Sequence, residues 1–246
     1  MGQIISVLSG KGGTGKTSVT AGLATALALQ GEKVLCIDCD IGLRNLDIAL
    51  GLAHASALSF LEVSQGDYTL EQALRHPKYP ELAFLTAPVN CQAEDIDRCA
   101  FSAMLRTARE QFDYVLLDAP AGIDLGFRLC AAFADRVLLV TCPEPAAVRD
   151  ATRAGEKLEL MGKTDVRLVV NRVNKKTFQI LGITVDDVMD EAGLPLMGII
   201  PEDHNVTLSA AFQEPLLLYK KRGDAARAFR RIAKRLRGLP EPIIFR

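Results

Sequence analysis

The stretch SGKGGTGKTSVT, residues 9–20, contains the phosphate-binding pattern G-x-x-x-x-G-K-[ST], with Lys16 as its lysine. An apolar run, 4–9, precedes it, and apolar residues at helical spacing follow from 16 to 30. A strand, a glycine-rich loop and a helix are therefore predicted in that order. The backbone N–H groups of such a loop, together with the positive end of the helix, bind phosphate.

The loop supplies a residue for each contact that a magnesium–nucleotide site requires. The residues expected to contact the nucleotide are Gly10, Lys11, Gly12, Gly13, Thr14, Gly15, Lys16, Thr17 and Ser18. Lys16 would neutralise the β- and γ-phosphates, the Thr17 hydroxyl would ligate Mg²⁺, and Ser18 would reach the α-phosphate. Lys11 is a second lysine that the pattern does not require.

Three carboxylates follow predicted strands. Asp118 ends YVLLD, and Asp38 and Asp40 close VLCIDCD (34–40), where they share a side if the strand continues. We predict that Asp118 and Asp38 serve the magnesium ion, with Asp38 as an outer-shell or switch residue. Asp40 would orient the attacking water, because a carboxylate is too weak a base to deprotonate water early. The alternatives are a turn-capping role for Asp118 and a solvent-exposed loop for the other two.

Short apolar runs alternate with helix-length segments along the whole chain. The predicted strands are 4–9, 33–38, 82–87, 114–119, 136–141, 167–172 and 196–201. Consecutive apolar positions are typical of strands covered on both faces, and the intervening segments are long enough for crossovers. We therefore predict an α/β fold of the P-loop NTPase class, a doubly wound, mostly parallel sheet with helices on both faces. We expect a single domain over 1–246, with a basic helix and tail at 219–246.

Composition argues against several other classes of protein. No uncharged apolar run approaches the ~20 residues that a membrane span needs, and no export signal precedes the first strand, so a cytoplasmic protein is expected. Six cysteines scattered through apolar segments indicate reduced thiols. Cys36 and Cys39 would point to opposite faces of a strand, which argues against a shared metal or redox site. The formal net charge of −1 conceals a basic segment at 220–237 that holds nine Lys or Arg and one Asp.

The K-G-G-x-G-K-T form of the loop resembles the deviant Walker A motif of the MinD/ParA group of ATPases. Within that group, the chain is most similar to the septum-site-determining MinD proteins. The similar segments are SGKGGTGKT (9–17), IDCDIGLRNLDIALGL (37–52), QGDYTLEQAL (65–74), DAPAGID (118–124), PEPAAVRDATR (143–153) and GIIPEDHNV (198–206). The resemblance implies an ATP hydrolase that requires Mg²⁺, dimerises when ATP binds, and controls the placement of the cell-division site.

The resemblance also implies roles for individual residues. In the family, the lysine matched by Lys11 crosses an ATP-sandwiched dimer to the partner's nucleotide, so Lys11 would be catalytic together with Lys16 and Asp40. The residues implied to recognise adenine are Asn171, Pro201, Glu202 and Asp203. The alternatives are that Lys11 is an ordinary exposed turn residue and that Asn171 caps the end of a strand.

Partners and location are likewise implied by resemblance. The implied partners are a second copy of the chain, bound when ATP is present, and division-site proteins that are MinC-like and MinE- or DivIVA-linked. The implied location is the cytoplasm, with a peripheral position at the inner face of the cell membrane. The related proteins continue beyond the segment matching 239–246 into a membrane-inserting helix. In this chain the basic helix, 224–238, would dock on the ATPase domain and bury Phe229 and Leu236. Only a weak, salt-sensitive attraction to anionic membranes is then expected.

The sequence leaves four other functions open. They are a ParA-type DNA partition ATPase, a MinD-like regulator of flagellar number, an iron–sulfur carrier and a nucleotide-binding adaptor without hydrolysis. The basic segment 220–237 would suit DNA, but IGLRNLD (41–47) and PEPAAVRD (143–150) favour division-site placement, so DNA binding is not expected. Cys99 and Cys130 lie in helical segments without glycine-rich surroundings, which argues against a cluster.

Overall fold

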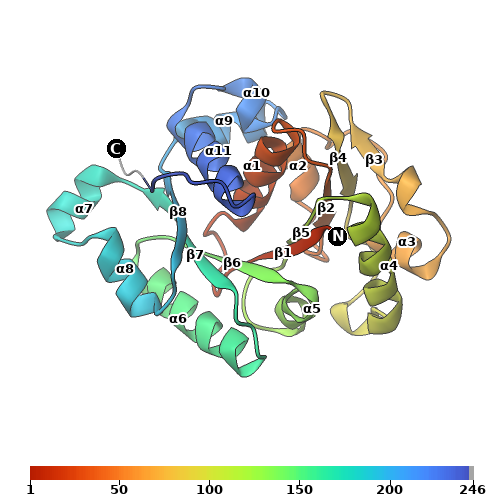
Figure 1. Cartoon of the computed structure of the whole chain (residues 1–246), viewed down its shortest axis with the longest axis horizontal. Coiled ribbons are helices and arrows are strands. Elements are labelled where there is room, and N and C mark those ends of the chain that lie inside the picture. Colours follow the sequence, from red (N-terminus) through yellow and green to blue (C-terminus); the bar gives the residue numbers. More distant parts are fainter. Residues whose placement is uncertain (244–246) are drawn as a thin grey trace.

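The computed structural model describes residues 1–243 and contains one eight-stranded sheet with helices on both faces (Figure 1). Residues 244–246, the end of the predicted tail 219–246, lie outside the described residues. The strands are β1 (Gln3–Leu8), β2 (Val34–Asp38), β3 (Leu74–His76), β4 (Tyr79–Leu85), β5 (Tyr114–Asp118), β6 (Arg136–Thr141), β7 (Val166–Val173) and β8 (Leu196–Pro201). Their order across the sheet is β3-β4-β2-β5-β1-β6-β7-β8.

The prediction of a doubly wound, mostly parallel sheet is confirmed. Every neighbouring pair of strands is parallel except β3 and β4, and the central strands β1, β2 and β5 are almost entirely buried. The short antiparallel edge strand β3 was not predicted, because its three residues, Leu74–His76, are too few to show an alternation. The strand expected at 82–87 begins earlier, at Tyr79, since it pairs with β3.

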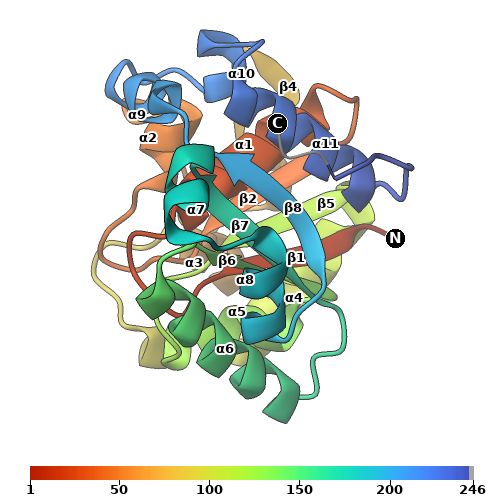
Figure 2. The ribbon, with the colours of Figure 1, turned by 90° about the vertical axis from the view of Figure 1, so that its left-hand side faces the viewer.

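The helices form a layer on each side of the sheet. They are α1 (Lys16–Ala28), α2 (Leu46–Leu50), α3 (Phe60–Gln65), α4 (Arg98–Gln111), α5 (Leu125–Phe133), α6 (Pro145–Leu160), α7 (Lys175–Leu181), α8 (Val185–Ala192), α9 (His204–Ala211), α10 (Leu216–Tyr219) and α11 (Asp224–Leu236). Figures 1 and 2 show α1, α2, α10 and α11 on one face, and α4, α5 and α6 on the other. Each layer encloses its own cluster of buried apolar side chains.

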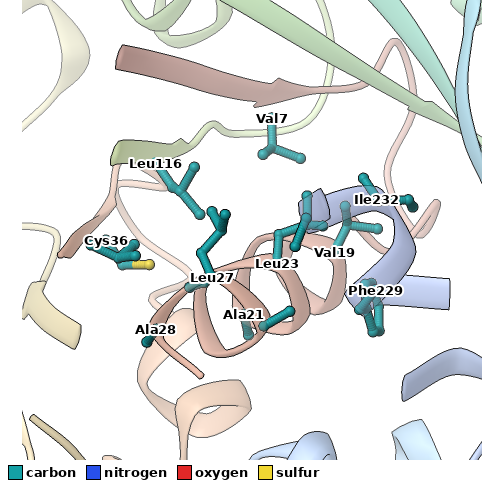
Figure 3. Packing of buried hydrophobic residues seen from close by; sticks show 14 of the residues in the cluster. Val7, Val19, Ala21, Leu23, Leu27, Ala28, Cys36, Leu116, Phe229 and Ile232 are labelled. Carbon is teal, nitrogen blue, oxygen red and sulfur yellow. The ribbon is translucent and has the colours of Figure 1, made fainter. Parts of the chain in front are cut away.

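Helix α1 is buried on nearly every side because α11 packs across it (Figure 3). A Cβ atom at Gly22 would lie only 2.6 Å from the Phe229 ring, so the absence of a side chain at Gly22 lets the two helices approach. Phe229 and Leu236 are 1% and 6% exposed. The predicted docking of the basic helix is therefore confirmed, and its charged residues lie on the outer side.

The thiols are arranged as the sequence predicts. Cys36 and Cys39 belong to the apolar clusters on opposite faces of the sheet. Cys99 and Cys130 lie in helices α4 and α5, the first exposed and the second buried. All six cysteines are free. Within residues 1–243, no helix is both long enough and apolar enough to cross a bilayer.

Candidate functional site

The phosphate loop connects the carboxyl end of β1 to the first turn of α1, as the sequence predicts. Gly13 and Gly15 have φ angles of +82° and +89°, a conformation that glycine adopts without strain. A side chain at Gly15 would also collide with the Asn171 amide, and one at Gly10 with the Asp150 carbonyl oxygen. Glycine at these positions therefore shapes the loop and lets neighbouring segments approach it closely.

Lys16 lies at the base of this loop and is 7% exposed. Burial lowers the pKa of its ammonium group, while the carboxylates of Asp118 and Asp40 act in the opposite direction. Thr17 and Ser18 are half-buried beside it. The Thr14 hydroxyl is buried without a hydrogen-bond partner among the described residues. A buried cation and an unpaired hydroxyl in one loop suit an oxyanion such as phosphate, which would satisfy both.

Two buried carboxylates lie next to the loop. Asp38 and Asp118 end adjacent parallel strands in direct register, and the Thr20 hydroxyl donates a 2.9 Å hydrogen bond to Asp118. Burial, reinforced by the charge of Asp38, raises the pKa of Asp118 to about 7, although hydrogen bonds from Thr17 and Thr20 oppose the rise. Burial likewise raises the pKa of Asp38 to about 6. Two carboxylates in this environment are stabilised by a nearby cation.

The sequence predicts that Asp40 shares a strand face with Asp38 if the strand continues. The strand does not continue, so the two residues do not share a face. Strand β2 ends at Asp38, because the Asp38 carboxylate accepts hydrogen bonds from the backbone N–H groups of Asp40 (2.9 Å) and Leu46 (3.2 Å). Asp38 thus organises the loop that follows it. Burial raises the pKa of the half-buried Asp40, and the charge of Lys16 opposes this rise, so the Asp40 carboxylate, outside the strand, is close enough to Lys16 to interact with it.

The oxygen ligands around Thr17 fit magnesium. Within residues 1–243, no group of three or more His, Cys, Asp and Glu side chains could hold a metal ion by itself. Mg²⁺ is usually bound through one or two carboxylates together with substrate phosphates and water, rather than by a cage made only of protein. Thr17 and Asp118, where the Thr17 hydroxyl is near enough to favour the charged form of the carboxylate, match that donor set, with Asp38 beside them.

The four residues expected to recognise adenine line one cavity of ≈ 800 Å³, which reaches the phosphate loop at Gly15 and Ser18. They are Asn171, two residues before the end of β7, Pro201, the last residue of β8, and Glu202 and Asp203, which follow it. Asn171 is 7% exposed, and its amide donates a 2.8 Å hydrogen bond to the carbonyl oxygen of Thr14. One polar side chain therefore joins this cavity to the phosphate loop.

Two residues of the adenine set also have structural partners. Asp203 caps α9 and accepts hydrogen bonds from the backbone N–H groups of Asn205 and Ala225, the latter in the first turn of α11. The Glu202 carboxylate accepts one from the Asn174 amide at 2.8 Å. The carboxylate of Asp203 is therefore occupied by the protein itself, whereas the carbonyl oxygen of Asn171 has no partner among the described residues.

Lys11 occupies the outer rim of the loop and is exposed. Its backbone carbonyl accepts a 2.7 Å hydrogen bond from the Ser9 hydroxyl, which fixes the loop beneath it. The Lys11 ammonium group forms no ion pair or side-chain hydrogen bond with residues 1–243. It is free to contact a group outside the chain.

Sequence reasoning missed three residues of the site. The Thr20 hydroxyl bonds Asp118, and its position four residues after Lys16 could have suggested that it faces the same strands. Phe229, from α11, lines the ≈ 800 Å³ cavity beside Asn171, and no local pattern could have placed it there. Arg172 lines the same cavity with a φ of +55°, at a register shift between β7 and β8.

Comparisons with known proteins agree with this geometry. The CobQ/CobB/MinD/ParA nucleotide-binding domain matches residues 5–216. The septum site-determining protein MinD of Synechocystis is 39% identical over 246 residues, which are 99% of this chain and 92% of that protein. The fold is similar to the Aquifex aeolicus MinC:MinD cell division complex, with a TM-score of 0.90, 35% identity and coverage of 99% of this chain and 98% of that one.

A second similar structure is the septum site-determining protein MinD from Pyrococcus horikoshii, complexed with Mg-ADP. Its TM-score is 0.83 at 30% identity, and the match covers 96% of both chains. That protein holds the magnesium nucleotide for which the loop described above has suitable groups.

Proposed function

Because the chain belongs to the CobQ/CobB/MinD/ParA nucleotide-binding family, we propose that it is a MinD-like switch that binds Mg²⁺–ATP, dimerises, hydrolyses ATP to ADP and phosphate, and helps place the division site. The observation that carries the proposal is a pair of lysines in one loop. Lys16 is buried at the base of the loop, and Lys11 is exposed at its rim without an ion-pair partner in residues 1–243.

The loop and its neighbouring cavity would bind the nucleotide. Backbone N–H groups of residues 10–15, the Lys16 ammonium group and the Ser18 hydroxyl would hold the phosphates. The adenine would enter the cavity beside Asn171, whose amide already donates to the Thr14 carbonyl and whose oxygen remains to accept from the base. Nucleotide affinity would thus depend both on the Asn171 side chain and on the position of the Thr14 carbonyl group to which it is hydrogen-bonded.

Hydrolysis would rely on positioning and charge. Mg²⁺, when bound beside Thr17 and Asp118, would neutralise charge on the β- and γ-phosphates. Asp40 would hold the attacking water, since its carboxylate faces the loop but lies outside the strand and retains solvent contact. Asp38 would link the loop that carries Asp40 to the magnesium side of the site, through its hydrogen bonds to Asp40 and Leu46.

Lys11 would act on the nucleotide of a second copy. A cation supplied by a partner stabilises the charge that develops during phosphoryl transfer, an effect of about 10³ to 10⁵ in rate where arginine fingers act. Because Lys11 is exposed at the rim of the loop and has no ion-pair partner within residues 1–243, it would be available to a second copy, and turnover would require the dimer. Hydrolysis would then separate the two copies and reset the switch.

The proposed partners follow from the relatives. A MinC-like protein would bind the ATP form, since a similar structure is a MinC:MinD complex. MinE- or DivIVA-linked proteins would regulate or position the switch. Peripheral attachment at the membrane would be weak and electrostatic for residues 1–243, because the apolar side of α11 is buried against α1 and β8.

Phosphate release at several protein concentrations tests the proposal. With ATP and Mg²⁺, the rate per protomer should rise with concentration, because the active species is a dimer. Lys16→Ala should lose nucleotide binding, whereas Lys11→Ala should bind nucleotide and fail to turn over. A rate per protomer that stays constant with concentration, together with full activity of Lys11→Ala, would contradict the dimer mechanism. Retention on DNA that requires ATP and weakens with salt would instead favour a partition ATPase.

A further inference from the structure

A second cavity, of ≈ 330 Å³, lies on the outer side of α11, away from the phosphate loop. Its walls come from α11, the end of β8 and the chain near Ile243. Arg227, Arg231 and Arg235, spaced four residues apart and so on one side of the helix, all line it. Its volume is near the lower end of the ~300–1,000 Å³ typical of small-molecule sites. It shares only Pro201 with the adenine cavity.

The three arginines differ in how many of their guanidinium donors form hydrogen bonds within the protein. The guanidinium of Arg235 donates to the carbonyl oxygens of Met197 (2.6 Å), Glu241 (2.9 Å) and Pro242 (2.7 Å), and thereby holds the segment after α11 in place. Arg227 is bonded to Asp224 and to the Arg222 carbonyl. These two guanidinium groups have structural roles.

Arg231 is the exception. Its side chain is 28% exposed, yet it forms no hydrogen bond with residues 1–243 and only a 3.6 Å contact with Glu241. Glu241 is also engaged by Lys234 at 2.9 Å. The nitrogen atoms of the Arg231 guanidinium are not among the fully buried polar atoms, so they still reach solvent, and their donors are available to a ligand that enters the cavity.

The charge around the cavity is unbalanced. Among the described residues, the side chains that line the cavity carry three positive charges, on Arg227, Arg231 and Arg235, and one negative charge, on Asp224. Glu241, next to the cavity, is shared by Arg231 and Lys234 and so does not balance this excess. Arg231 and Arg235 repel one another, since the charge of Arg231 contributes to lowering the pKa of Arg235. A dianion would balance the excess and supply acceptors to Arg231.

We propose that this cavity binds a phosphomonoester, with Arg231 as its main hydrogen-bond donor. A phosphomonoester carries about −1.5 to −2 charges at pH 7 and presents three acceptor oxygens, which match the charge and the free guanidinium donors. Ile199 and Ile243 form an apolar wall opposite, which suits the organic part of the ester. The ester is either a soluble metabolite or the headgroup of a phospholipid, and the two arms of the experiment separate these sources.

The first arm measures binding of sn-glycerol 3-phosphate by ³¹P NMR line broadening, with Mg²⁺–ADP in excess to occupy the phosphate loop. The second measures sedimentation with phosphatidylcholine vesicles that contain or lack phosphatidic acid. Three variants are compared with the unsubstituted chain. Arg231→Gln removes the proposed main donor, and the matched control Lys221→Gln removes one charge from the same basic surface outside the cavity. Glu241→Gln removes the carboxylate that contacts Arg231.

Arg231→Gln should weaken binding about tenfold or more, the effect of losing charge-assisted hydrogen bonds, in whichever arm detects the ligand. Lys221→Gln should change the affinity less than about twofold, and Glu241→Gln should increase it, because Arg231 gains free donors. The unfolding midpoint of each variant checks that the fold is retained. Equal losses in Arg231→Gln and Lys221→Gln would show only diffuse charge attraction and overturn the proposal. So would the absence of binding to the unsubstituted chain in both arms.

Discussion

Replacing Asp118 with asparagine should affect the stability of the nucleotide-free protein differently at pH 5 and pH 8. The free energy of unfolding of the variant, minus that of the unsubstituted chain, should be larger at pH 8 than at pH 5. Asp118 is 1% exposed, and its pKa rises from its usual 3.8 to about 7. This raised pKa means that the stability associated with the protonated carboxyl is complete below pH 3.8 and is lost as the pH rises through 7. The asparagine side chain carries no charge, so the variant does not lose stability in this way.

The magnitude follows from the linkage between protonation and folding. With about 1.4 kcal/mol per pKa unit, the difference in free energy of unfolding between variant and parent should increase by about 2–3 kcal/mol from pH 5 to pH 8. The hydrogen bond that the asparagine fails to make with Thr17 or Thr20 costs the same at both pH values and cancels from this comparison.

Urea denaturation at the two pH values measures the effect. Asp67→Asn, at an exposed carboxylate without an ion pair in residues 1–243, is the matched control and should show no such increase. A difference for Asp118→Asn that stays constant between pH 5 and pH 8 would refute the argument from burial and from repulsion by Asp38. Whatever its stability without ligand, the variant should bind Mg²⁺–ADP more weakly than the parent.

Three further substitutions test other parts of the site. Asp40→Ala should bind ATP normally, lower turnover about 100-fold or more and accumulate as an ATP-bound dimer in size-exclusion chromatography; turnover at the parent rate would show that Asp40 is a bystander. Asn171→Ala removes the 2.8 Å hydrogen bond to Thr14 and should raise the Kd for ADP about tenfold by calorimetry, whereas an unchanged Kd would disconnect Asn171 from the nucleotide. Phe229→Ala should lower the free energy of unfolding by about 3–5 kcal/mol in urea, because it empties the contact between α11 and α1; a loss below about 1 kcal/mol would mean that α11 is only loosely docked.

Much of the sheet could be predicted because it depends on local pattern. Runs such as YVLLD (114–118) are apolar on consecutive positions, which is typical of strands covered on both faces, and glycine-rich loops between a strand and a helix have a well-defined geometry. The edge strand Leu74–His76 escaped prediction because its pairing with β4, rather than its composition, makes it a strand.

The positions of the candidate site residues could be predicted where the residues lie at or near strand ends, and less well where distant segments meet. Asp118 is the last residue of β5 and Asn171 lies near the carboxyl end of β7 in the same mostly parallel sheet, so their approach to the loop follows from topology. The hydrogen bond of Asn171 to Thr14, across 157 positions of the chain, depends on the close approach of two loops. The contribution of Phe229 to the cavity beside Asn171 depends on how α11 crosses α1, which no local pattern specifies.

The central claim is that ATP causes two copies of this chain to dimerise and that Lys11 acts across the dimer interface. Sedimentation velocity with Mg²⁺–ATP or Mg²⁺–ADP tests this claim most directly. The proteins compared are the unsubstituted chain, Lys11→Ala and the control Lys33→Ala. Lys33 serves as the control because it is an exposed lysine just before β2 and away from the loop. We predict that the unsubstituted chain and Lys33→Ala are dimers with ATP and monomers with ADP, whereas Lys11→Ala binds ATP but remains a monomer. A Lys11→Ala variant that dimerises with ATP and hydrolyses it at the parent rate would contradict the account.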